Sequence, residues 1–332
     1  MVRPLNILLF SFSFVLISCQ KSNLSIDASQ LTQRIDYNIL DSGWSYSRPI
    51  RNLEDALLDI YFIDTNSGAL ISKGDLYRTT DGGLNWKKYE NQNFNNKGFV
   101  LYNIFLNKNK DLYLVGGQKK IIKIIGDSLL ETSTQNEVSD IYFINDNIGY
   151  AISGTSLLKT INAGKTWSVN KMNLFSNGKY SPNQSLFFLN NRGVVTGENK
   201  VAYSTANDTS WNISTINEAF QTNAVFMISE NTYFISSNIG IYRTTNGGSS
   251  FTQVFSFSAR SNYYVDLHFV NSSIGYFSYY NSIYKTSNAG NSWERIIALR
   301  ERENEAIIEI HFTSESNGWA CTSSGGILKY IK

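Results

Sequence analysis

The apolar positions of this chain fall into short strands that are separated by turns. Runs such as Asp59-Ile60-Tyr61-Phe62 and Asp140-Ile141-Tyr142-Phe143 are rich in β-branched and aromatic residues, which favour strands. A glycine then opens a second apolar run, as in Gly149-Tyr150-Ala151-Ile152, and two further runs follow across turns of Gly, Asn and Asp. The pattern therefore predicts repeated units of four short strands.

A turn that ends in an aromatic residue marks most of these units. The segment from Thr79 to Trp86 reads Thr-Thr-Asp-Gly-Gly-Leu-Asn-Trp, and similar segments end at Trp167, Phe251 and Trp293. A weaker copy without the glycine ends at Trp211. Successive aromatics are 81, 44, 40 and 42 residues apart, so one copy is missing between the first two. Four strands in a period of about 40 residues are typical of a β-propeller blade.

The two ends of the chain are expected to share the last blade. Residues 308–332 supply three strands and then stop, whereas Trp44 lies 42 residues before Trp86. The segment around Trp44 should therefore supply the missing outer strand and close the ring. Residues 100–133 form a divergent second blade, in which Gly126-Asp127-Ser128 replaces the turn. The sequence thus predicts an all-β, seven-bladed propeller of four-stranded antiparallel blades, whose closure removes free sheet edges.

The repeated turn residues are expected to be structural. In such a turn the Asp or Asn side chain accepts backbone hydrogen bonds, Gly allows a positive φ, and the aromatic residue packs between adjacent sheets. We assign this role to Asp81, Gly83, Trp86, Asn162, Gly164, Trp167, Trp211, Asn246, Gly248, Asn288, Gly290 and Trp293. Basic residues that recur just before the turn belong to the same repeat: Arg78, Lys159, Arg243 and Lys285.

The turn Ser/Thr-x-Asp-x-Gly-x-x-Trp resembles the Asp-box, or BNR repeat, and residues 40–332 resemble BNR-type propellers. In the sequence of its repeats and in its number of blades, the chain resembles the photosystem II assembly and stability factor family. This resemblance implies a seven-bladed fold and a role in assembly or interaction. Sialidases share the Asp-box but have six blades. Their Arg-Ile-Pro segment is absent here, where residues 47–51 read Ser-Arg-Pro-Ile-Arg. Because Asp-boxes occur in proteins of unrelated activity, the repeat alone does not identify a function.

The N-terminus has the pattern of an export signal. Arg3 precedes an apolar run from Leu5 to Ile17, which is shorter than the roughly 20 residues of a membrane span. The following Leu16-Ile17-Ser18-Cys19 resembles the lipobox of bacterial lipoproteins, so lipid attachment is expected at Cys19. An ordinary secretory signal with an incidental Cys is the alternative. We expect a signal peptide at 1–18, the lipidated Cys and a polar tether at 19–35, and the propeller at 36–332.

The predicted export and lipid attachment have two consequences for the rest of the chain. Gln20 directly after the Cys favours sorting to the outer membrane. We therefore expect a lipid-anchored protein of the bacterial cell envelope. If Cys19 carries lipid, Cys321 is the one thiol left, and no internal disulfide can form. A buried, inert Cys321 is the expected state.

Charge and rare residue types exclude several classes of function. The chain has 29 Lys and Arg against 27 Asp and Glu, a balance that argues against nucleic-acid binding. Its two histidines, His268 and His311, occupy the inner-strand position that Tyr61 and Tyr142 hold in other blades. They are expected to pack there, with a metal site as the alternative. We therefore expect no catalytic residue, metal or cofactor, and a monomer.

One set of candidate binding residues is expected to meet at the channel mouth. The first residues of the seven inner strands read Asp59, Asn103, Asp140, Ser185, Asn223, Asp266 and Glu309. Four acids around one opening would create a local negative field, able to accept a cation or a basic group of a partner. The alternative is that each side chain caps its own strand or bonds the backbone of a neighbouring blade.

A second set lies in loops that should gather on one face of the ring: Lys97, Phe99, Lys119, Lys120, Phe175, Tyr180, Arg260, Tyr279 and Tyr280. Aromatic residues beside Lys and Arg are typical of a protein-binding surface, although the aromatics could instead pack inward. The sequence therefore favours an envelope-anchored interaction or assembly scaffold with a protein partner. A glycan-binding protein or sialidase-like glycoside hydrolase is the alternative, and it would require acids and arginines to converge at the channel mouth.

Overall fold

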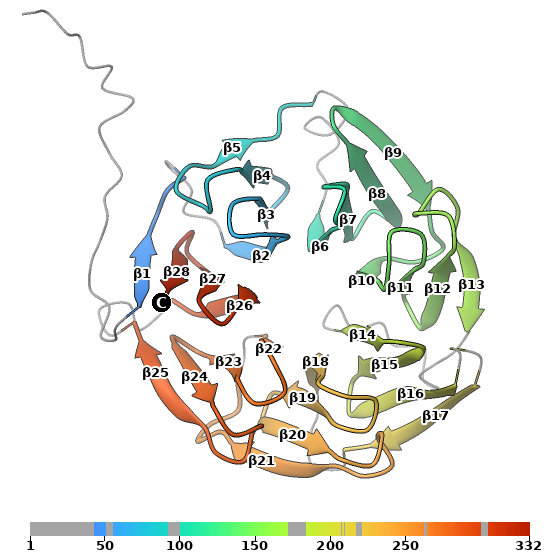
Figure 1. Cartoon of the computed structure of the whole chain (residues 1–332). Coiled ribbons are helices and arrows are strands. Elements are labelled where there is room, and N and C mark those ends of the chain that lie inside the picture. The colour runs from blue at the N-terminus through green and yellow to red at the C-terminus, as the bar shows by residue number, and fades with distance from the viewer. Residues whose placement is uncertain are drawn as a thin grey trace, which may run out of the picture. The chain divides into compact units, whose positions relative to one another are not determined.

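Seven four-stranded antiparallel sheets surround a central channel as the blades of a propeller (Figure 1). The computed structural model describes residues 43–50, 56–91, 100–171, 184–206, 208, 210–216, 221–261, 264–299 and 305–332. All of them belong to one compact unit of residues 34–332. Within these ranges the chain forms no helix long and apolar enough to cross a bilayer. The predicted fold class and blade count are confirmed.

Each blade begins with an inner strand beside the channel. The inner strands are β2 (Leu57–Phe62), β6 (Leu101–Leu106), β10 (Val138–Phe143), β14 (Leu186–Leu189), β18 (Thr222–Met227), β22 (Leu267–Phe269) and β26 (Ile307–Ser314). Each pairs with a second strand: β3 (Gly68–Ser72), β7 (Leu112–Gly116), β11 (Gly149–Ser153), β15 (Arg192–Gly197), β19 (Tyr233–Ser237), β23 (Gly275–Tyr279) or β27 (Asn317–Thr322). Their side chains are mostly buried, because both faces of each sheet contact a neighbouring blade.

The third and outer strands complete each sheet toward the rim. The third strands are β4 (Leu76–Thr79), β8 (Lys120–Ile125), β12 (Ser156–Thr160), β16 (Lys200–Ala206), β20 (Gly240–Thr244), β24 (Ser282–Thr286) and β28 (Ile327–Ile331). The outer strands are β5 (Lys87–Lys88), β9 (Ser128–Ser133), β13 (Ser168–Lys171), β17 (Ser210–Thr215), β21 (Thr252–Ser256), β25 (Glu294–Ala298) and, in the last blade, β1 (Trp44–Ser47).

The N-terminal strand closes the ring as predicted. β1 pairs antiparallel with β28, with Trp44 opposite Tyr330 and Ser47 opposite Ile327. Trp44 is 7% exposed and meets Phe312 edge-on at 5.8 Å between ring centroids. Trp86 meets Phe62 in the first blade at the same 5.8 Å, so the two indoles occupy equivalent positions.

A buried carboxylate adds a second link at this closure. Glu305, which is 4% exposed, accepts a hydrogen bond from the Tyr46 hydroxyl at 2.9 Å and another from the Thr322 hydroxyl. Arg48 Nη2 lies 3.6 Å from the same carboxylate. Glu305 therefore joins the N-terminal strand to the end of β27, a contact that the sequence pattern did not predict.

Neighbouring blades interlock through a repeated contact between Phe, Gly and Trp. Phe62, Phe143 and Phe269 each end an inner strand opposite a glycine of the second strand. A Cβ atom at Gly68, Gly149 or Gly275 would lie only 2.6 Å from that ring, so these positions exclude any larger residue. The Trp of the repeat then packs edge-on against the same Phe, which fills the space between this blade and the preceding one.

The repeated turns are held by their own side chains. Asp81 Oδ1 accepts from the backbone N–H of Asn85 at 2.9 Å and from the Thr79 hydroxyl at 2.8 Å. Asn162, Asn246 and Asn288 accept equivalent backbone bonds from residues 166, 250 and 292. Gly83 has a φ of +86°, which a residue with a Cβ rarely adopts. These bonds occupy the polar groups of the turn within the turn itself.

Basic residues of three third strands link their blade to the turn of the next. Lys123 Nζ donates to the carbonyl oxygen of Ala163 at 3.0 Å, and Arg243 Nη1 donates to that of Ala289 at 3.2 Å. Lys159 Nζ lies 2.8 Å from the buried carboxylate of Asp208. Lys159 and Arg243 thus serve the ring, in agreement with their assignment to the repeat, and Lys123 makes an equivalent link that the sequence did not predict.

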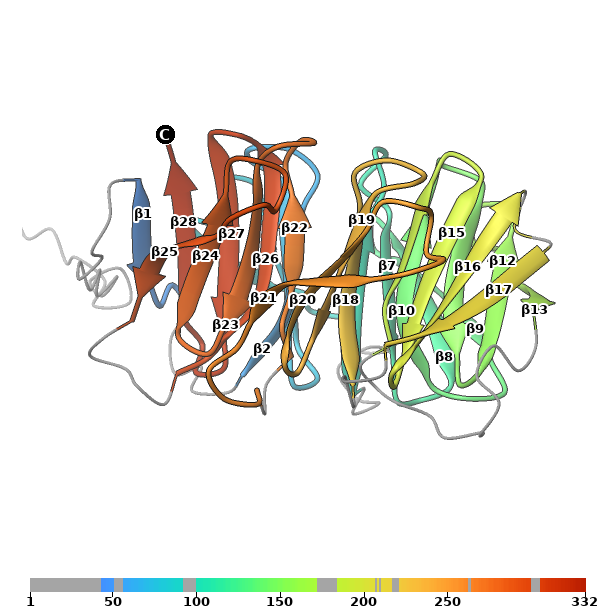
Figure 2. The same ribbon diagram turned by 90° about the horizontal axis from the view of Figure 1, so that it is seen from below.

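The strand order divides the loops between two faces, which Figure 2 shows edge-on. The segments that join one blade to the next bond the turns between second and third strands, as Thr134 N–H does to the Lys119 carbonyl and Ile307 N–H to that of Tyr280. We call this side the connector face. The repeated turns at residues 80–86, 161–167, 245–251 and 287–293 lie on the opposite side, the hairpin face.

Candidate functional site

A cavity of about 560 Å³ occupies the central channel and is lined by residues from all seven inner strands or the positions just before them. This volume lies within the range of roughly 300–1,000 Å³ that is usual for small-ligand sites. The inner strands lie at the channel edge of each sheet, so consecutive residues of one strand, such as Ser139 and Asp140, line the cavity. The wall consists of a polar level near the connector face and an aromatic level below it.

The polar level contains most of the ring that the sequence predicted. Asp59, Asn103, Asp140, Ser185, Asp266 and Glu309 all line the cavity, whereas Asn223 does not. Ala224 lies two residues before Phe226, as Asp59 lies two residues before Tyr61, so Ala224 takes the position that the acids hold in other blades. The placement of Asn223 in the ring is therefore wrong. The prediction misaligned this strand by one residue, which matching Phe226 to Tyr61 in the sequence would have avoided.

Three of the acids also link adjacent blades. Asp59 Oδ2 accepts from the backbone N–H of Ile104 at 2.7 Å, Asp140 Oδ2 from Leu186 at 2.8 Å, and Asp266 Oδ2 from Ile310 at 2.9 Å. Thr196 makes the comparable link in another blade, where its hydroxyl donates to the Asn223 carbonyl at 2.9 Å. The alternative role considered for the ring, bonding to a neighbouring blade, thus applies to these three aspartates.

Glu309 differs from the aspartates in its partner. Its carboxyl group hydrogen-bonds that of Asp266, so one proton is shared between two acids at the channel mouth. Burial and the charges of Asp266, Asp59 and Asp140 raise the pKa of Glu309 well above its ordinary range. Burial likewise raises the pKa of Asp140 to about 7 and that of Asp266 to about 6. The described wall contains no Lys or Arg that would offset these acids.

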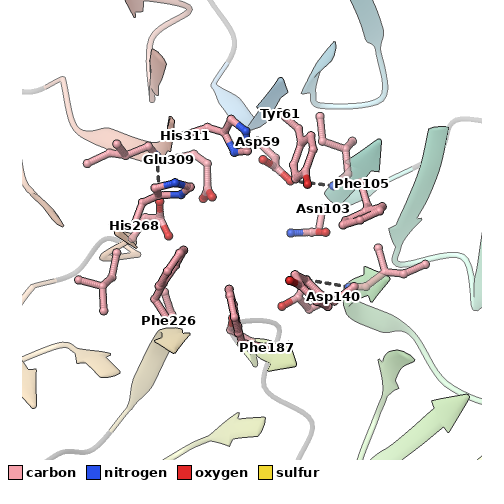
Figure 3. Close-up of a pocket in the computed structure, with 18 of the residues that line it drawn as sticks. Asp59, Tyr61, Asn103, Phe105, Asp140, Phe187, Phe226, His268, Glu309 and His311 are labelled. Atoms are coloured by element: carbon pink, nitrogen blue, oxygen red, sulfur yellow. Dashed lines mark hydrogen bonds between the residues drawn. The ribbon is translucent and has the colours of Figure 1, made fainter. Parts of the chain in front are cut away.

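Seven aromatic side chains, one from each blade, form a closed circle below the polar level: Tyr61, Phe105, Tyr142, Phe187, Phe226, His268 and His311. Figure 3 labels six of them, all except Tyr142. Each ring contacts the next, and neighbouring centroids are 4.4 to 5.7 Å apart around the whole circle. The sequence predicted the shared position of the histidines and two tyrosines but not the complete circle. The sequence signal for the circle is an aromatic residue two positions after each residue of the channel mouth, including Ala224.

The two histidines belong to this circle as packing residues. The Nε2–H of His311 donates to the Phe62 carbonyl oxygen at 2.7 Å, and His268 bonds the backbone of Phe312. Burial lowers the pKa of His311 to about 4 and that of His268 well below its usual value. Both rings are therefore neutral at pH 7. Among the described residues no group of three or more His, Cys, Asp or Glu side chains is placed to hold a metal ion.

The loop candidates lie apart from the cavity. Tyr279 stacks on Phe257 at 4.2 Å, and its hydroxyl donates to the Ala259 carbonyl at 2.9 Å. The Tyr280 hydroxyl donates to the Arg260 carbonyl at 3.1 Å, so both tyrosines hold the 257–261 loop. Lys119 and the Arg260 side chain are exposed on the connector face, and Lys120 pairs with Glu131 at 2.6 Å. Cys19, Lys97, Phe99, Phe175 and Tyr180 lie outside the described residues.

Comparison with known proteins identifies relatives in fold. No protein-family model matches the sequence, and no curated protein matches it significantly. Among solved structures, YCF48 bound to D1 peptide is similar with a TM-score of 0.70 and 16% identity, over 90% of this chain and 97% of that one. YCF48 from Cyanidioschyzon merolae has a TM-score of 0.68 and 14% identity, over 87% and 99%.

A protein with a different name shares the fold to the same degree. Virginiamycin B lyase from Staphylococcus aureus is similar with a TM-score of 0.70 and 13% identity, over 87% of this chain and 99% of that one. At these identities the likeness shows a seven-bladed propeller alone, and the function has to be argued from the residues of this chain.

Proposed function

We propose that this chain is a non-catalytic interaction scaffold that binds a protein partner through its connector face. The observation that carries the proposal is the charge pattern of the connector face. This face surrounds the acidic channel mouth and carries the exposed side chains of Lys119 and Arg260 outside that mouth. This face is negative at its centre and positive at its margin, so it suits a partner whose charges have the opposite arrangement.

The proposed anchor is lipid on Cys19, which the lipobox-like residues 16–19 support. A lipid-held domain in the bacterial cell envelope, with the tether at 19–35, would present the propeller to membrane or periplasmic proteins. The resemblance to photosystem II assembly factors and the fold likeness to YCF48 bound to a D1 peptide are in keeping with a peptide or protein partner.

A hydrolase is the less favoured candidate. The carboxyl groups of Asp266 and Glu309 bond each other directly, whereas the two acids of glycosidases usually lie about 5–5.5 Å or 6.5–9.5 Å apart. The same wall offers no arginine, among the described residues, to grip a substrate carboxylate. This arrangement favours binding over glycoside hydrolysis.

The test is a pull-down from detergent-solubilised envelope with the full-length lipidated chain as bait. Lys119→Glu with Arg260→Glu should reduce recovery of the partner about fivefold, because both charges lie on the connector face. Cys19→Ser should move the bait itself from the detergent phase to the aqueous phase.

The matched control reverses two exposed lysines on the hairpin face, Lys108→Glu with Lys165→Glu. This variant has the same change in net charge and should retain the partner. If both double variants lose the partner equally, or if neither changes its recovery, the partner does not bind at the connector face. A wild-type chain in the aqueous phase without a lipid mass increment would contradict the anchor.

A further inference from the structure

Three polar side chains of the channel wall have an oxygen atom without a hydrogen-bond partner. They are Asn103 Oδ1, Ser139 Oγ and Gln184 Oε1, on three consecutive blades. Ser139 and Gln184 are only 4% and 3% exposed. Leaving a buried polar group unpaired costs about 1–3 kcal/mol. The three oxygens are buried within the wall, so rotation of their side chains would present them to a donor in the cavity. Two of the three are acceptors only at the unpaired atom, so a ligand rich in N–H groups would satisfy them.

The remainder of the polar level has the same preference. The carboxyl groups of the polar level accept hydrogen bonds when they are ionised: Asp59, Asp140, Asp266 and Glu309. Among the described residues, none that lines the cavity carries a positive charge. Glu309 bonds another acid rather than a donor. A positively charged N–H donor among these groups would relieve the repulsion between the acids and satisfy the unpaired oxygens at the same time.

The aromatic circle completes this site from below. Each of its rings lies two residues after a position of the polar level, which corresponds to about 6–7 Å along a strand. Ring faces attract cations, most strongly where water is excluded. Their apolar surface also accommodates a hydrocarbon chain. Figure 3 shows the labelled rings and carboxyl groups around the same opening.

From this arrangement we propose that the channel binds a small organic cation, a primary ammonium or guanidinium group on an alkyl chain. Glu309, Asp266 and Gln184 accept its N–H groups, and the aromatic circle surrounds its alkyl part. The site goes beyond the proposed function, because a free amine can fill it without a protein partner. A Lys or Arg side chain of a protein partner carries the same ammonium or guanidinium group as a free amine. The experiments distinguish these two sources of the cation.

The first experiment titrates the full-length chain in detergent with n-butylammonium and n-butylguanidinium by calorimetry. n-Butanol and butyrate serve as neutral and anionic probes of the same length. Saturable binding of the two cations, with at least about tenfold weaker binding of butanol and butyrate, is expected from charge-assisted hydrogen bonds. Equal affinity for butanol, or no saturable binding of either cation, would overturn the proposal.

The variants locate the cation. Glu309→Gln keeps the shape and leaves intact the backbone bonds that Asp59, Asp140 and Asp266 make to the next blade. It should weaken butylammonium about tenfold without lowering the melting temperature. Phe226→Leu should weaken it about two- to fivefold through loss of a ring face. Glu294→Gln, on the exposed face of outer strand β25, is the matched control and should change nothing; unchanged affinity in Glu309→Gln would refute the site.

The source of the cation follows from combining both assays. If Glu309→Gln loses butylammonium and also the captured partner, the partner supplies the basic group. If it loses butylammonium but retains the partner, the site holds a free amine. If neither cation binds and the partner still depends on Lys119 and Arg260, this inference fails while the proposed function stands.

Discussion

At the scale of single residues, the acids of the channel mouth combine two roles that the sequence presented as alternatives. Asp59, Asp140 and Asp266 each use one carboxylate oxygen to bond the next blade, yet all three line the cavity. Their shared position at the start of each inner strand predicted that these residues would meet. It could not predict their bonds, because a hydrogen bond to a neighbouring blade depends on the distance between sheets rather than on spacing along the chain.

The acids should make the stability of the fold depend on pH. Burial raises the pKa of Asp140 to about 7 and holds the pKa values of Asp59 and Glu309 well above their ordinary range. The folded chain therefore binds protons that the unfolded chain has already released, so the free energy of unfolding falls as pH rises. Urea unfolding should show a loss of about 1–2 kcal/mol between pH 6.5 and 8.

Glu309→Gln should reduce this slope, because it removes one of the acids, whereas Glu294→Gln should preserve it. Below about pH 6.5 the histidines oppose the trend. Burial lowers the pKa of His311 to about 4, so each buried histidine gives the unfolded chain one extra proton there. The acids with a raised pKa outnumber the two histidines, so the histidines make the pH dependence shallower below pH 6.5 without reversing it. A flat profile across pH 6.5–8 would show that the acids do not titrate in this range.

At the scale of one strand, β1 illustrates what a repeat can and cannot predict. The 42-residue step from Trp44 to Trp86 predicted its pairing, because the repeat fixes where an outer strand must lie. The clamp around Glu305 was not predictable in this way. Glu305 lies in a segment between blades that follows no repeat, and its partners Tyr46 and Thr322 are far apart in sequence.

Trp44→Ala should destabilise the protein by about 3–5 kcal/mol, the usual cost of removing a large buried aromatic side chain. The indole is 7% exposed and contacts both Phe312 and Tyr330. Urea unfolding followed by circular dichroism measures the change. Val169→Ala, on the exposed surface of β13, should cost less than about 0.5 kcal/mol. A similar small loss for Trp44→Ala would mean that β1 contributes little to the closed ring.

At the scale of the whole molecule, periodicity was enough to predict a ring of seven blades but not its chemistry. All seven sheets repeat the same strand order, and most blades repeat the Phe–Gly–Trp contact and the turn, so one blade predicts the strand order of the others. The channel wall instead depends on the residue type that each blade supplies. Ala224 stands at the mouth where three other blades place an aspartate, and the period of the repeat does not determine that choice.

A chain that begins at residue 52 should fail to form a stable monomer. It lacks β1, which leaves the edge of β28 unpaired, and such edges promote aggregation. Size-exclusion chromatography and thermal melting measure the outcome. A chain that begins at residue 36 retains the strand and is the control. A peptide of residues 43–50 added in trans should restore part of the stability by pairing with β28, whereas wild-type melting of the shorter chain would contradict the observed pairing.

The closure of the ring also sets an order of events during synthesis. Ser45 bonds the backbone of Lys329, 284 residues later in the chain, so β1 must wait for the synthesis of β28. Six blades can assemble from their own consecutive strands as they emerge, but the seventh cannot. Contacts of such long sequence separation slow folding, and the open ring exposes two unpaired edges in the meantime. Closure of the ring is therefore tied to the synthesis of β28.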